Sequence, residues 1–242
     1  MNILDEILSS LPEAPVAVRK VIIGVHWTLV CSKHAGLGST LVNCGPHGHS
    51  HMREVGDLLN KSAQELAGWI KSDNMLEASV GIAAINSLLE VDESQLVDIN
   101  AAEVLARRAA GKNLAVIGHF PFVEKIRSKT ANCWVIEKTP YGDDLADEAA
   151  SQFLPQADVV PITGTSFINH SIEHLLSLCK PDSVLILLGP STPLSTVLLN
   201  RGITYLSGSR VIDEESAALT IQQGASFPQV KGVKVVTLST EK

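Results

Sequence analysis

Largely apolar runs of strand length alternate with segments of helical length from residue 113 to the end of the chain. Such runs are typical of strands buried on both faces, and six occur, at residues 114–117, 134–136, 159–162, 184–188, 203–206 and 233–236. Between them the pattern predicts helices over residues 122–129, 144–153, 169–179, 193–200 and 214–223. Strands that alternate with helices favour an α/β fold with an open, doubly wound, mainly parallel sheet and right-handed crossovers.

The first half of the chain has a different pattern. Residues 21–30 alternate between two faces, which predicts one strand, and residues 39–42 could return as its antiparallel partner. Ser62 and Glu65 form a capping-box signature that predicts a helix to about residue 71. Residues 78–89 are apolar nearly all round, which is typical of a buried helix. A further helix over 101–110 leads into the sheet, so we place a domain boundary near residues 98–112.

Composition narrows the partners that the chain can have. Of 242 residues, 45% are hydrophobic and 19% charged, the formal net charge is -7, and no basic run occurs, so nucleic acid and anionic membranes are not expected partners. The longest apolar run, 184–188, is far shorter than the roughly 18 residues that cross a bilayer. The N-terminus shows no export signal, which predicts a cytoplasmic protein with reduced cysteines. A homodimer is expected only because dimers are common.

The ends of the first two predicted strands suggest a nucleoside-like ligand. Ligands of doubly wound sheets bind beyond the carboxyl ends of the strands. The first strand ends in Gly118, His119 and Phe120, which lack the glycine pattern of a dinucleotide site. Glu137 follows Gly118 by 19 residues (137 minus 118), close to the offset of about 20 at which an acid meets a ribose hydroxyl. The alternative is a surface carboxylate paired with Lys138.

The next two strand ends carry small hydroxyl residues. The third ends in Thr163, Gly164 and Thr165 with Asn169 beyond, and the fourth ends in Gly189, Ser191 and Thr192. Hydroxyls and free N–H groups before a helix attract anions. Plain helix capping is the alternative for each end alone. Because both neighbouring ends share this chemistry, the sequence predicts a pocket for a small anionic ligand.

Five of the eight histidines lie between residues 26 and 51. Cys44, His47, His49 and His51 provide four candidate ligands in one loop, a set that suits zinc, copper or nickel. This ligand set makes a divalent transition metal the candidate cofactor. The spacing of the four residues matches no standard zinc module, so the alternative is a solvated loop that binds no metal.

Two polar residues stand in the predicted apolar helix. Glu77 and Asn86 could each face a site, although Glu77 could instead close a capping box with Asn74. Nine residues at about 100° each place the two on opposite faces, so at most one faces a cleft. The acidic residues 143–148 look like a solvated helix start, and we assign them no role.

Several motifs taken in order resemble a prokaryotic family described as "putative heavy-metal chelation" proteins. They are residues 118–122, 135–138, 157–160, 163–165 with 169, 188–194 and 207–211, and in the first half 23–28 and 76–86. The resemblance implies a small α+β domain like the enolase N-terminal domain over residues 1–105, a Rossmann-like domain over 106–242, and a site between them. Residues 44–51 are outside the motifs that match.

The candidate ligand-binding residues combine the strand ends with the positions that the resemblance implies. They are Asn86, Gly118, His119, Phe120, Glu137, Thr163, Gly164, Thr165, Asn169, Gly189, Ser191 and Thr192. The first hypothesis is a protein of metal handling that binds a small anionic or metal-chelating ligand in a cleft between two domains. The second is an enzyme that binds S-adenosylmethionine or NAD with Glu137 on the ribose. The third is metal storage by the histidine loop alone. No catalytic residue is assigned, because common hydrolase, NTPase and zincin motifs are missing.

Overall fold

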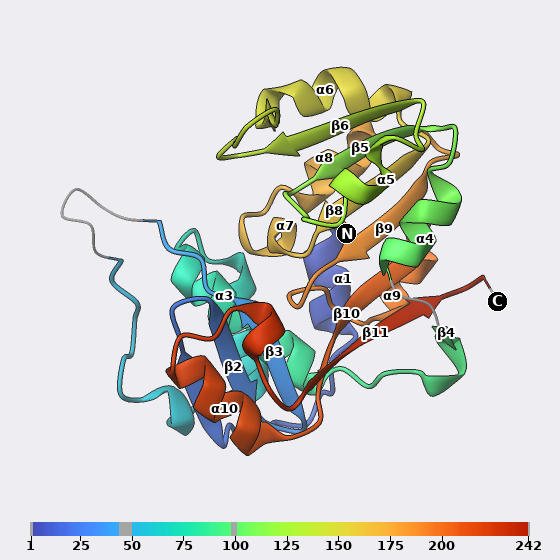
Figure 1. Cartoon of the computed structure of the whole chain (residues 1–242). Helices are drawn as coiled ribbons and strands as arrows, with labels where there is room; N and C mark the ends of the chain where they lie inside the picture. Colours follow the sequence, from blue (N-terminus) through green and yellow to red (C-terminus); the bar gives the residue numbers. More distant parts are fainter. Residues whose placement is uncertain (1, 44–49, 98–100, 242) are drawn as a thin grey trace.

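The chain folds around two β-sheets, which lie side by side in Figure 1. The structure is a computed structural model, and it describes residues 2–43, 50–97 and 101–241. One sheet has three antiparallel strands and the other has eight mainly parallel strands. We call them the small sheet and the large sheet. The α/β class predicted from the sequence is confirmed, whereas the likeness of the two parts to enolase and Rossmann domains stays a prediction.

The large sheet has the strand order β4-β11-β10-β9-β8-β5-β6-β7. Its neighbours are parallel except for the pairs that include β11. All six predicted strands of this half form, and two short strands, β4 and β7, add to the edges. The strands are β4 (Leu96–Val97), β5 (Asn113–Ile117), β6 (Asn132–Glu137), β7 (Leu145–Ala146), β8 (Val159–Thr163), β9 (Val184–Leu188), β10 (Tyr205–Val211) and β11 (Val233–Ser239).

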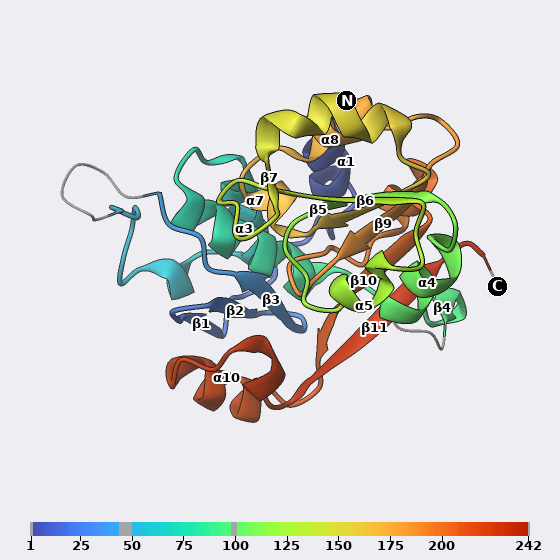
Figure 2. The ribbon, with the colours of Figure 1, turned by 45° about the horizontal axis from the view of Figure 1, so that its top comes forward.

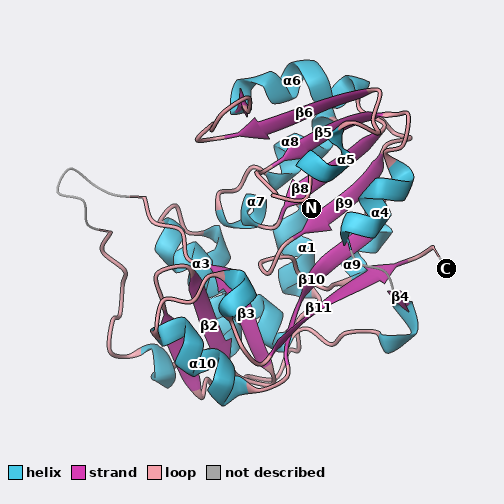
Figure 3. Ribbon diagram, viewed as in Figure 1, coloured by secondary structure: helices cyan, strands magenta, loops and turns pink. Residues whose placement is uncertain are grey.

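Helices cover both faces of the large sheet. In Figure 3, α4 and α5 lie in front of it, and α1 and α8 lie behind it. Successive residues of β5 point to opposite faces, so Val116 packs with α4 and α5 while Ala115 and Ile117 pack on the other side. The helices of this half are α4 (Ala101–Arg108), α5 (Glu124–Arg127), α6 (Ala150–Phe153), α7 (Thr165–Ile168), α8 (Ile172–Leu178) and α9 (Thr196–Asn200).

One predicted helix of this half is largely wrong. The segment 144–153 begins with β7, continues as a 3-10 turn over Asp147–Ala149, and is α-helical only in α6. Leu145 and Ala146 pair with Ile136 and Glu137 at the sheet edge, so pairing replaces the first helical turn. Local preference alone would let the acidic residues begin a helix here. Pairing of β7 with the edge of β6 prevents this.

The small sheet corrects a second prediction. The alternating segment 21–30 is not one strand but a hairpin of β1 (Lys20–Ile23) and β2 (Trp27–Cys31), paired antiparallel. The chain reverses between them, where the N–H of Gly24 donates to the carbonyl of Trp27 at 2.9 Å. Alternation with a period of two continues through a tight turn, so the pattern did not reveal the reversal. The antiparallel partner is β3 (Ala35–Ser39), slightly earlier than expected.

Helices α2 (Ala63–Gly68) and α3 (Met75–Leu88) belong to the small-sheet half. The predicted capping box at the start of α2 is present, with Ser62 and Glu65 bonded reciprocally. Helix α3 packs against β2 and β3 and is buried along most of its length, as its apolar pattern predicted. Figure 2 shows the small sheet between α3 on one side and α10 on the other.

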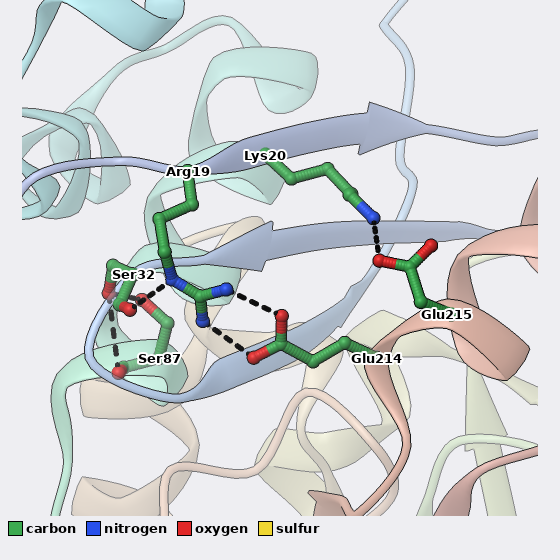
Figure 4. Close-up of polar contacts among 6 residues, drawn as sticks. All are labelled: Arg19, Lys20, Ser32, Ser87, Glu214 and Glu215. Atoms are coloured by element: carbon green, nitrogen blue, oxygen red, sulfur yellow. Dashed lines mark hydrogen bonds and ion pairs between the residues drawn. The ribbon is translucent and has the colours of Figure 1, made fainter.

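Helix α10 (Glu214–Gln222) comes from the C-terminal part of the chain but covers the small sheet. Its buried residues Ala217, Ala218 and Ile221 form a cluster with residues of β2 and β3 that include Leu29 and Leu37. Two ion pairs fix its first turn, as Figure 4 shows. The Arg19 guanidinium donates to both carboxylate oxygens of Glu214 at 2.6 and 2.7 Å, and Lys20 donates to Glu215 at 2.6 Å.

Helix α1 (Ile3–Ser9) makes the reverse connection, from the N-terminus to the large-sheet half. Arg201, which follows α9, donates to both oxygens of Glu6 at 2.6 and 2.7 Å. The backbone N–H of Ile3 donates to Glu173 of α8 at 2.9 Å. Each sheet is therefore covered in part by a helix from the far end of the chain.

No helix within the described part of the chain is both long enough and apolar enough to cross a membrane.

Because α10 covers the small sheet and α1 covers the large sheet, we predict that both sheets unfold together. Ile221 is 1% exposed under the small sheet, so Ile221→Ala should lower the free energy of unfolding of the whole chain by about 2–4 kcal/mol. Leu219 is 56% exposed on the same helix, and Leu219→Ala is the matched control, with a change within about 0.5 kcal/mol. Urea unfolding followed by tryptophan fluorescence and by circular dichroism measures both. Two separate transitions in the Ile221→Ala variant would contradict a shared unit.

Candidate functional site

A pocket of about 180 Å³ opens at the carboxyl ends of β5, β6 and β8. It contains five of the residues that the sequence predicted, from three different strand ends. We call it the switch-point pocket, and it is lined by Ile117, Gly118, Ile136, Glu137, Lys138, Asp147, Ala150, Thr163, Thr165, Asn169, Ser171, His174 and Leu175.

The strand order explains this location. From β5 the chain passes to β6 on one side, and it then crosses back to β8 on the other side of β5. The connections after β5 and β8 therefore leave in opposite directions and open a crevice between them. In open α/β sheets, ligands bind at such a switch point beyond the carboxyl ends of the strands.

Glu137, the last residue of β6, is held by backbone groups. One carboxylate oxygen accepts the N–H of His119 at 3.0 Å, and the other accepts the N–H of Lys138 at 2.9 Å. The Lys138 ammonium instead lies 3.5 Å from the Asp147 carboxylate. The ion pair of Glu137 with Lys138 that the sequence allowed does not form. Each oxygen of a carboxylate has a second lone pair, so Glu137 retains acceptor capacity toward the pocket.

Gly118 allows the turn that brings His119 to Glu137. Its φ is +109°, a backbone conformation that L side chains rarely adopt, and an added Cβ would lie 3.0 Å from the Cβ of Thr163. The His119 ring turns toward Asp144, with 2.9 Å between Nδ1 and a carboxylate oxygen. Phe120 stacks on Phe122 with 5.5 Å between the ring centroids. Of these three predicted residues, only Gly118 lines the pocket.

The hydroxyl-rich segment after β8 forms a network of its own. The hydroxyls of Thr163 and Thr165 are 3.0 Å apart, and Asn169 Oδ1 accepts both the N–H and the hydroxyl of Ser171 at 3.2 and 2.6 Å. The helices that follow are short, with four residues in α7 and seven in α8. Because a short helix has a weak macrodipole, the side chains rather than a helix N-terminus set the chemistry here.

The strand end after β9 lies outside this pocket. Ser191 and Thr192 are each 1% exposed, and Ser191 Oγ accepts the N–H of Ser39 in β3 at 2.8 Å. An added Cβ on Gly164 would lie 2.6 Å from the backbone nitrogen of Thr192, so the ends of β8 and β9 pack backbone to backbone. Gly189, with φ of +104°, turns the chain out of β9. This turn connects the large sheet to the small sheet.

Asn86 lines a second pocket, of about 260 Å³, where the end of α3 meets β10. Its Nδ2 donates to the carbonyl of Leu37 at 2.9 Å, and its Oδ1 is buried with no hydrogen-bond partner in the described chain. Glu77 faces elsewhere. It is 6% exposed and accepts the backbone N–H of Arg53 and the hydroxyl of Ser72, so it does not close the capping box.

The predicted metal ligands Cys44, His47 and His49 lie outside the described residues. His51 is described and exposed, and its carbonyl accepts Asn74 Nδ2 at 2.7 Å. Asn43 also bonds at the start of α3, where its Oδ1 accepts the N–H of Met75. Residues before and after positions 44–49 therefore contact the same end of α3. Across residues 2–43, 50–97 and 101–241, no three His, Cys, Asp or Glu side chains are placed to hold a metal ion together.

The cysteines in the described part of the chain are free thiols. Burial raises the pKa of Cys31 to about 11, with a further rise from the nearby Glu214 carboxylate. Burial also raises the pKa of Cys179 to about 11 and raises the pKa of Cys133. Burial therefore disfavours the thiolate, the form that binds a metal ion, at all three positions.

Sequence reasoning missed four polar residues of the switch-point pocket and the partner of His119. Lys138, Asp147, Ser171 and His174 line the pocket, and Asp144 bonds His119. The nearest signal was the acidic segment 143–148, which resembles a solvated helix start. Only its pairing with β6 turns Asp144 inward, where its side chain is 5% exposed.

The raised pKa values predict slow thiol chemistry. At pH 8, a thiol with a pKa of about 11 is ionised in only about one molecule in a thousand, so Cys31 and Cys179 should be unreactive in the folded protein. The experiment uses a Cys44→Ser variant, which leaves only the three described thiols, and an aromatic disulfide reagent. We expect the variant to react orders of magnitude faster in guanidinium. Equal rates in folded and unfolded protein would contradict the burial argument.

Comparisons with known proteins show relatives of this chain and solved structures with the same fold. An uncharacterized protein from Methanocaldococcus jannaschii is 27% identical over 217 residues, which are 86% of this chain and 83% of that protein. A crystal structure of a protein of unknown function from Desulfitobacterium hafniense has a TM-score of 0.82 and 27% identity, and the match covers 98% of this chain and 97% of that chain. A second, from Pyrococcus horikoshii, has a TM-score of 0.83 and 20% identity over 98% of both chains, which shows the fold alone.

Two family models with the same description, "Putative heavy-metal chelation", match residues 4–89 and residues 100–239. Together they span most of the chain and coincide with the motifs that carried the resemblance in the sequence. The chain belongs to the family of proteins described as "Putative heavy-metal chelation".

Proposed function

We propose that this protein binds a small ligand that donates hydrogen bonds, and that the switch-point pocket holds it. One observation carries the proposal: polar side chains from three strand ends line a single pocket at the switch point of the sheet. Small-molecule sites combine apolar walls with a few convergent polar groups. Ile117, Ile136 and Leu175 supply such walls here.

The charges of the pocket favour a neutral or cationic ligand over the anion expected from the sequence. Two carboxylates, Glu137 and Asp147, line the pocket with one ammonium, Lys138, which lies beside Asp147. The hydroxyls of Thr163 and Thr165 bond each other and offer no cluster of positive charge. A ligand with hydroxyl or ammonium groups would find acceptors, whereas an anion would meet two carboxylates at short range.

The family's description, heavy-metal chelation, agrees with this proposal if the ligand carries a chelated metal ion. The described residues contain no set of three ligands for a bare ion, so a metal ion in this pocket would take most of its ligands from a small chelator. The protein would then recognise the chelator through its polar groups. In this form, metal handling and small-ligand binding are one function.

A nucleoside-containing cofactor is the second candidate, and Glu137 is the observation that favours it. The carboxylate ends the strand next to β5, 19 residues after Gly118, as does the acid that meets a ribose in dinucleotide-binding sheets. A pyrophosphate is less well served, because α5 has only four residues and begins with Glu124. Among nucleoside-containing cofactors, S-adenosylmethionine, which has no pyrophosphate, therefore fits the pocket better than NAD does.

Binding in the switch-point pocket should depend on its polar side chains. We expect adenosine, S-adenosylmethionine or the nickel complex of L-histidine to raise the thermal midpoint of the protein, since a ligand of the folded state stabilises it by mass action. Glu137→Gln and Thr165→Val should each weaken binding of the active probe by roughly 5- to 20-fold, because a hydrogen-bonding partner is lost. Isothermal titration calorimetry measures the affinities.

The control for these variants is Glu148→Gln, at an exposed carboxylate of the same segment that does not line the pocket. It should bind the active probe as the unmodified protein does. If neither Glu137→Gln nor Thr165→Val weakens binding of the active probe, the ligand binds elsewhere and the proposal for this pocket is wrong.

Uptake of free metal should depend on the histidine segment instead. Since the described residues offer no three-ligand cluster, replacing His47, His49 and His51 together by Ala should abolish the binding of free Ni²⁺ in equilibrium dialysis. The Glu137→Gln variant should retain it. If Ni²⁺ uptake survives the triple replacement, storage of metal by this segment is excluded.

A further inference from the structure

The second pocket, of about 260 Å³, lies where the two halves of the chain meet, and we call it the junction pocket. Its lining residues belong to two distant stretches of the chain, 34–93 and 194–211. The first stretch includes Ala35 of β3 and residues at and after the end of α3, and the second includes residues of β10. Neither stretch lines the switch-point pocket, so the junction pocket is a separate candidate site.

The wall formed by β10 carries backbone groups without a strand partner. Pairing of β10 with β9 ends at Ser207, whose carbonyl accepts the N–H of Gly189 at 3.0 Å, whereas β10 continues to Val211. The backbone groups of every second residue point to the same side of a strand, so those of Ser209 and Val211 point past the end of β9. No strand among the described residues pairs with them there. Both residues line the junction pocket, which therefore has backbone donors and acceptors in its wall.

An ion pair between the two stretches lies at this pocket. Arg210 donates through Nη1 to Glu93 Oε1, and both residues line the pocket. The remaining N–H groups of the Arg210 guanidinium and the second carboxylate oxygen of Glu93 make no hydrogen bond to any other described residue. The side chains are 41% and 65% exposed, so solvent screens the pair and holds it only weakly. The pocket thus presents a positive and a negative group side by side, each with bonding capacity left.

Asn86 adds a buried acceptor to the same pocket. Its Nδ2 donates to the carbonyl of Leu37 at 2.9 Å, which fixes the orientation of the amide, and its Oδ1 is buried without a partner among the described residues. An unpaired buried acceptor is unfavourable, so a donor bound in the pocket would stabilise it. Glu90 is less available, because Lys33 and His34 lie 2.5 and 3.2 Å from its two oxygens.

We propose that the junction pocket binds an α-amino acid with an aliphatic side chain, its carboxylate on Arg210 and its ammonium on Glu93 and Asn86. An α-amino acid carries its two charges on one carbon atom, so they lie as close together as the guanidinium and the carboxylate of the Arg210–Glu93 pair. Arginine binds a carboxylate with two N–H groups at once. Leu89, Val91, Leu194 and Val211 line the same pocket and supply apolar contacts for the side chain. This site does not rest on the function proposed for the switch-point pocket.

The test compares L-leucine with two analogues that each lack one charge. 3-Methylbutylamine is L-leucine without the carboxylate, and 4-methylpentanoate is L-leucine without the ammonium. We expect L-leucine to bind roughly 10- to 100-fold more tightly than either analogue, the loss of one hydrogen-bonded charge. Isothermal titration calorimetry on the full chain, without added metal, measures the three affinities.

Variants then assign each charge of the ligand to its partner. Arg210→Gln should remove the preference for L-leucine over the amine and leave the preference over the acid. Glu93→Gln should do the reverse, because it removes the partner of the ammonium. A purely structural role of the ion pair would change all three affinities together and not these ratios. Arg19→Gln, which breaks the pair with Glu214 away from this pocket, is the matched control and should change neither ratio.

The results that contradict the proposal are distinct from one another. If L-leucine does not bind at millimolar concentration, or if either analogue binds as tightly, recognition of the zwitterion is wrong. If the preference over the amine survives Arg210→Gln, the carboxylate lies elsewhere and the site is wrong. Glu137→Gln, in the switch-point pocket, should leave binding of L-leucine unchanged, and a loss of affinity in that variant would place L-leucine in the other pocket.

Discussion

The apolar contact between α10 and the small sheet is the interaction on which the two-sheet arrangement depends. Burial of one large aliphatic side chain such as Ile221 stabilises a fold by about 1.5–3 kcal/mol. The Arg19–Glu214 pair, whose side chains are 49% and 30% exposed, contributes about 0–1 kcal/mol. The ion pairs therefore fix the position of α10, and apolar burial supplies most of the stability. Because β10 leads directly into α10, the small sheet gains this cover only when the large sheet is in place.

The same arrangement holds the strand ends of the large sheet against the small-sheet half. Ser191 bonds Ser39 of β3, and Nε2 of His170 donates to the carbonyl of Ile70 at 2.7 Å. His170 has a φ of +59°, an uncommon conformation for a residue other than glycine, and it stands between Asn169 and Ser171 of the pocket wall. The far half of the chain thus helps to set the geometry of a pocket that the large sheet forms. A substitution in either half can reach the pocket through these contacts.

The chemistry of the pocket follows from how its polar groups are satisfied. Backbone N–H groups hold Glu137, and neighbouring side chains hold Thr163 and Asn169, so the walls are ordered without a ligand. What they still offer is mainly acceptor capacity. Burial raises the pKa of the described cysteines and so disfavours their thiolate forms. These facts support the proposed binding of a donor-bearing molecule, in which a metal ion would enter the pocket only as the cargo of a chelator.

Patterns within the sequence were enough to predict the α/β class, the six main strands of the large sheet, the capping box of α2 and the family. These features depend on local periodicity and on short motifs, which a single chain displays directly. It also placed Gly118, Glu137, Thr163, Thr165 and Asn169 at strand ends, and the parallel order of the strands brought them into one pocket. Periodicity did not reveal the turn within residues 21–30, since alternation is the same before and after a reversal. Three features became visible only in the folded chain: Ser191 joins the two sheets, Asn86 lines a separate pocket, and Asp144 turns inward to His119. Each of these depends on contacts between residues far apart in the chain or on pairing at a sheet edge, and no local pattern encodes such contacts.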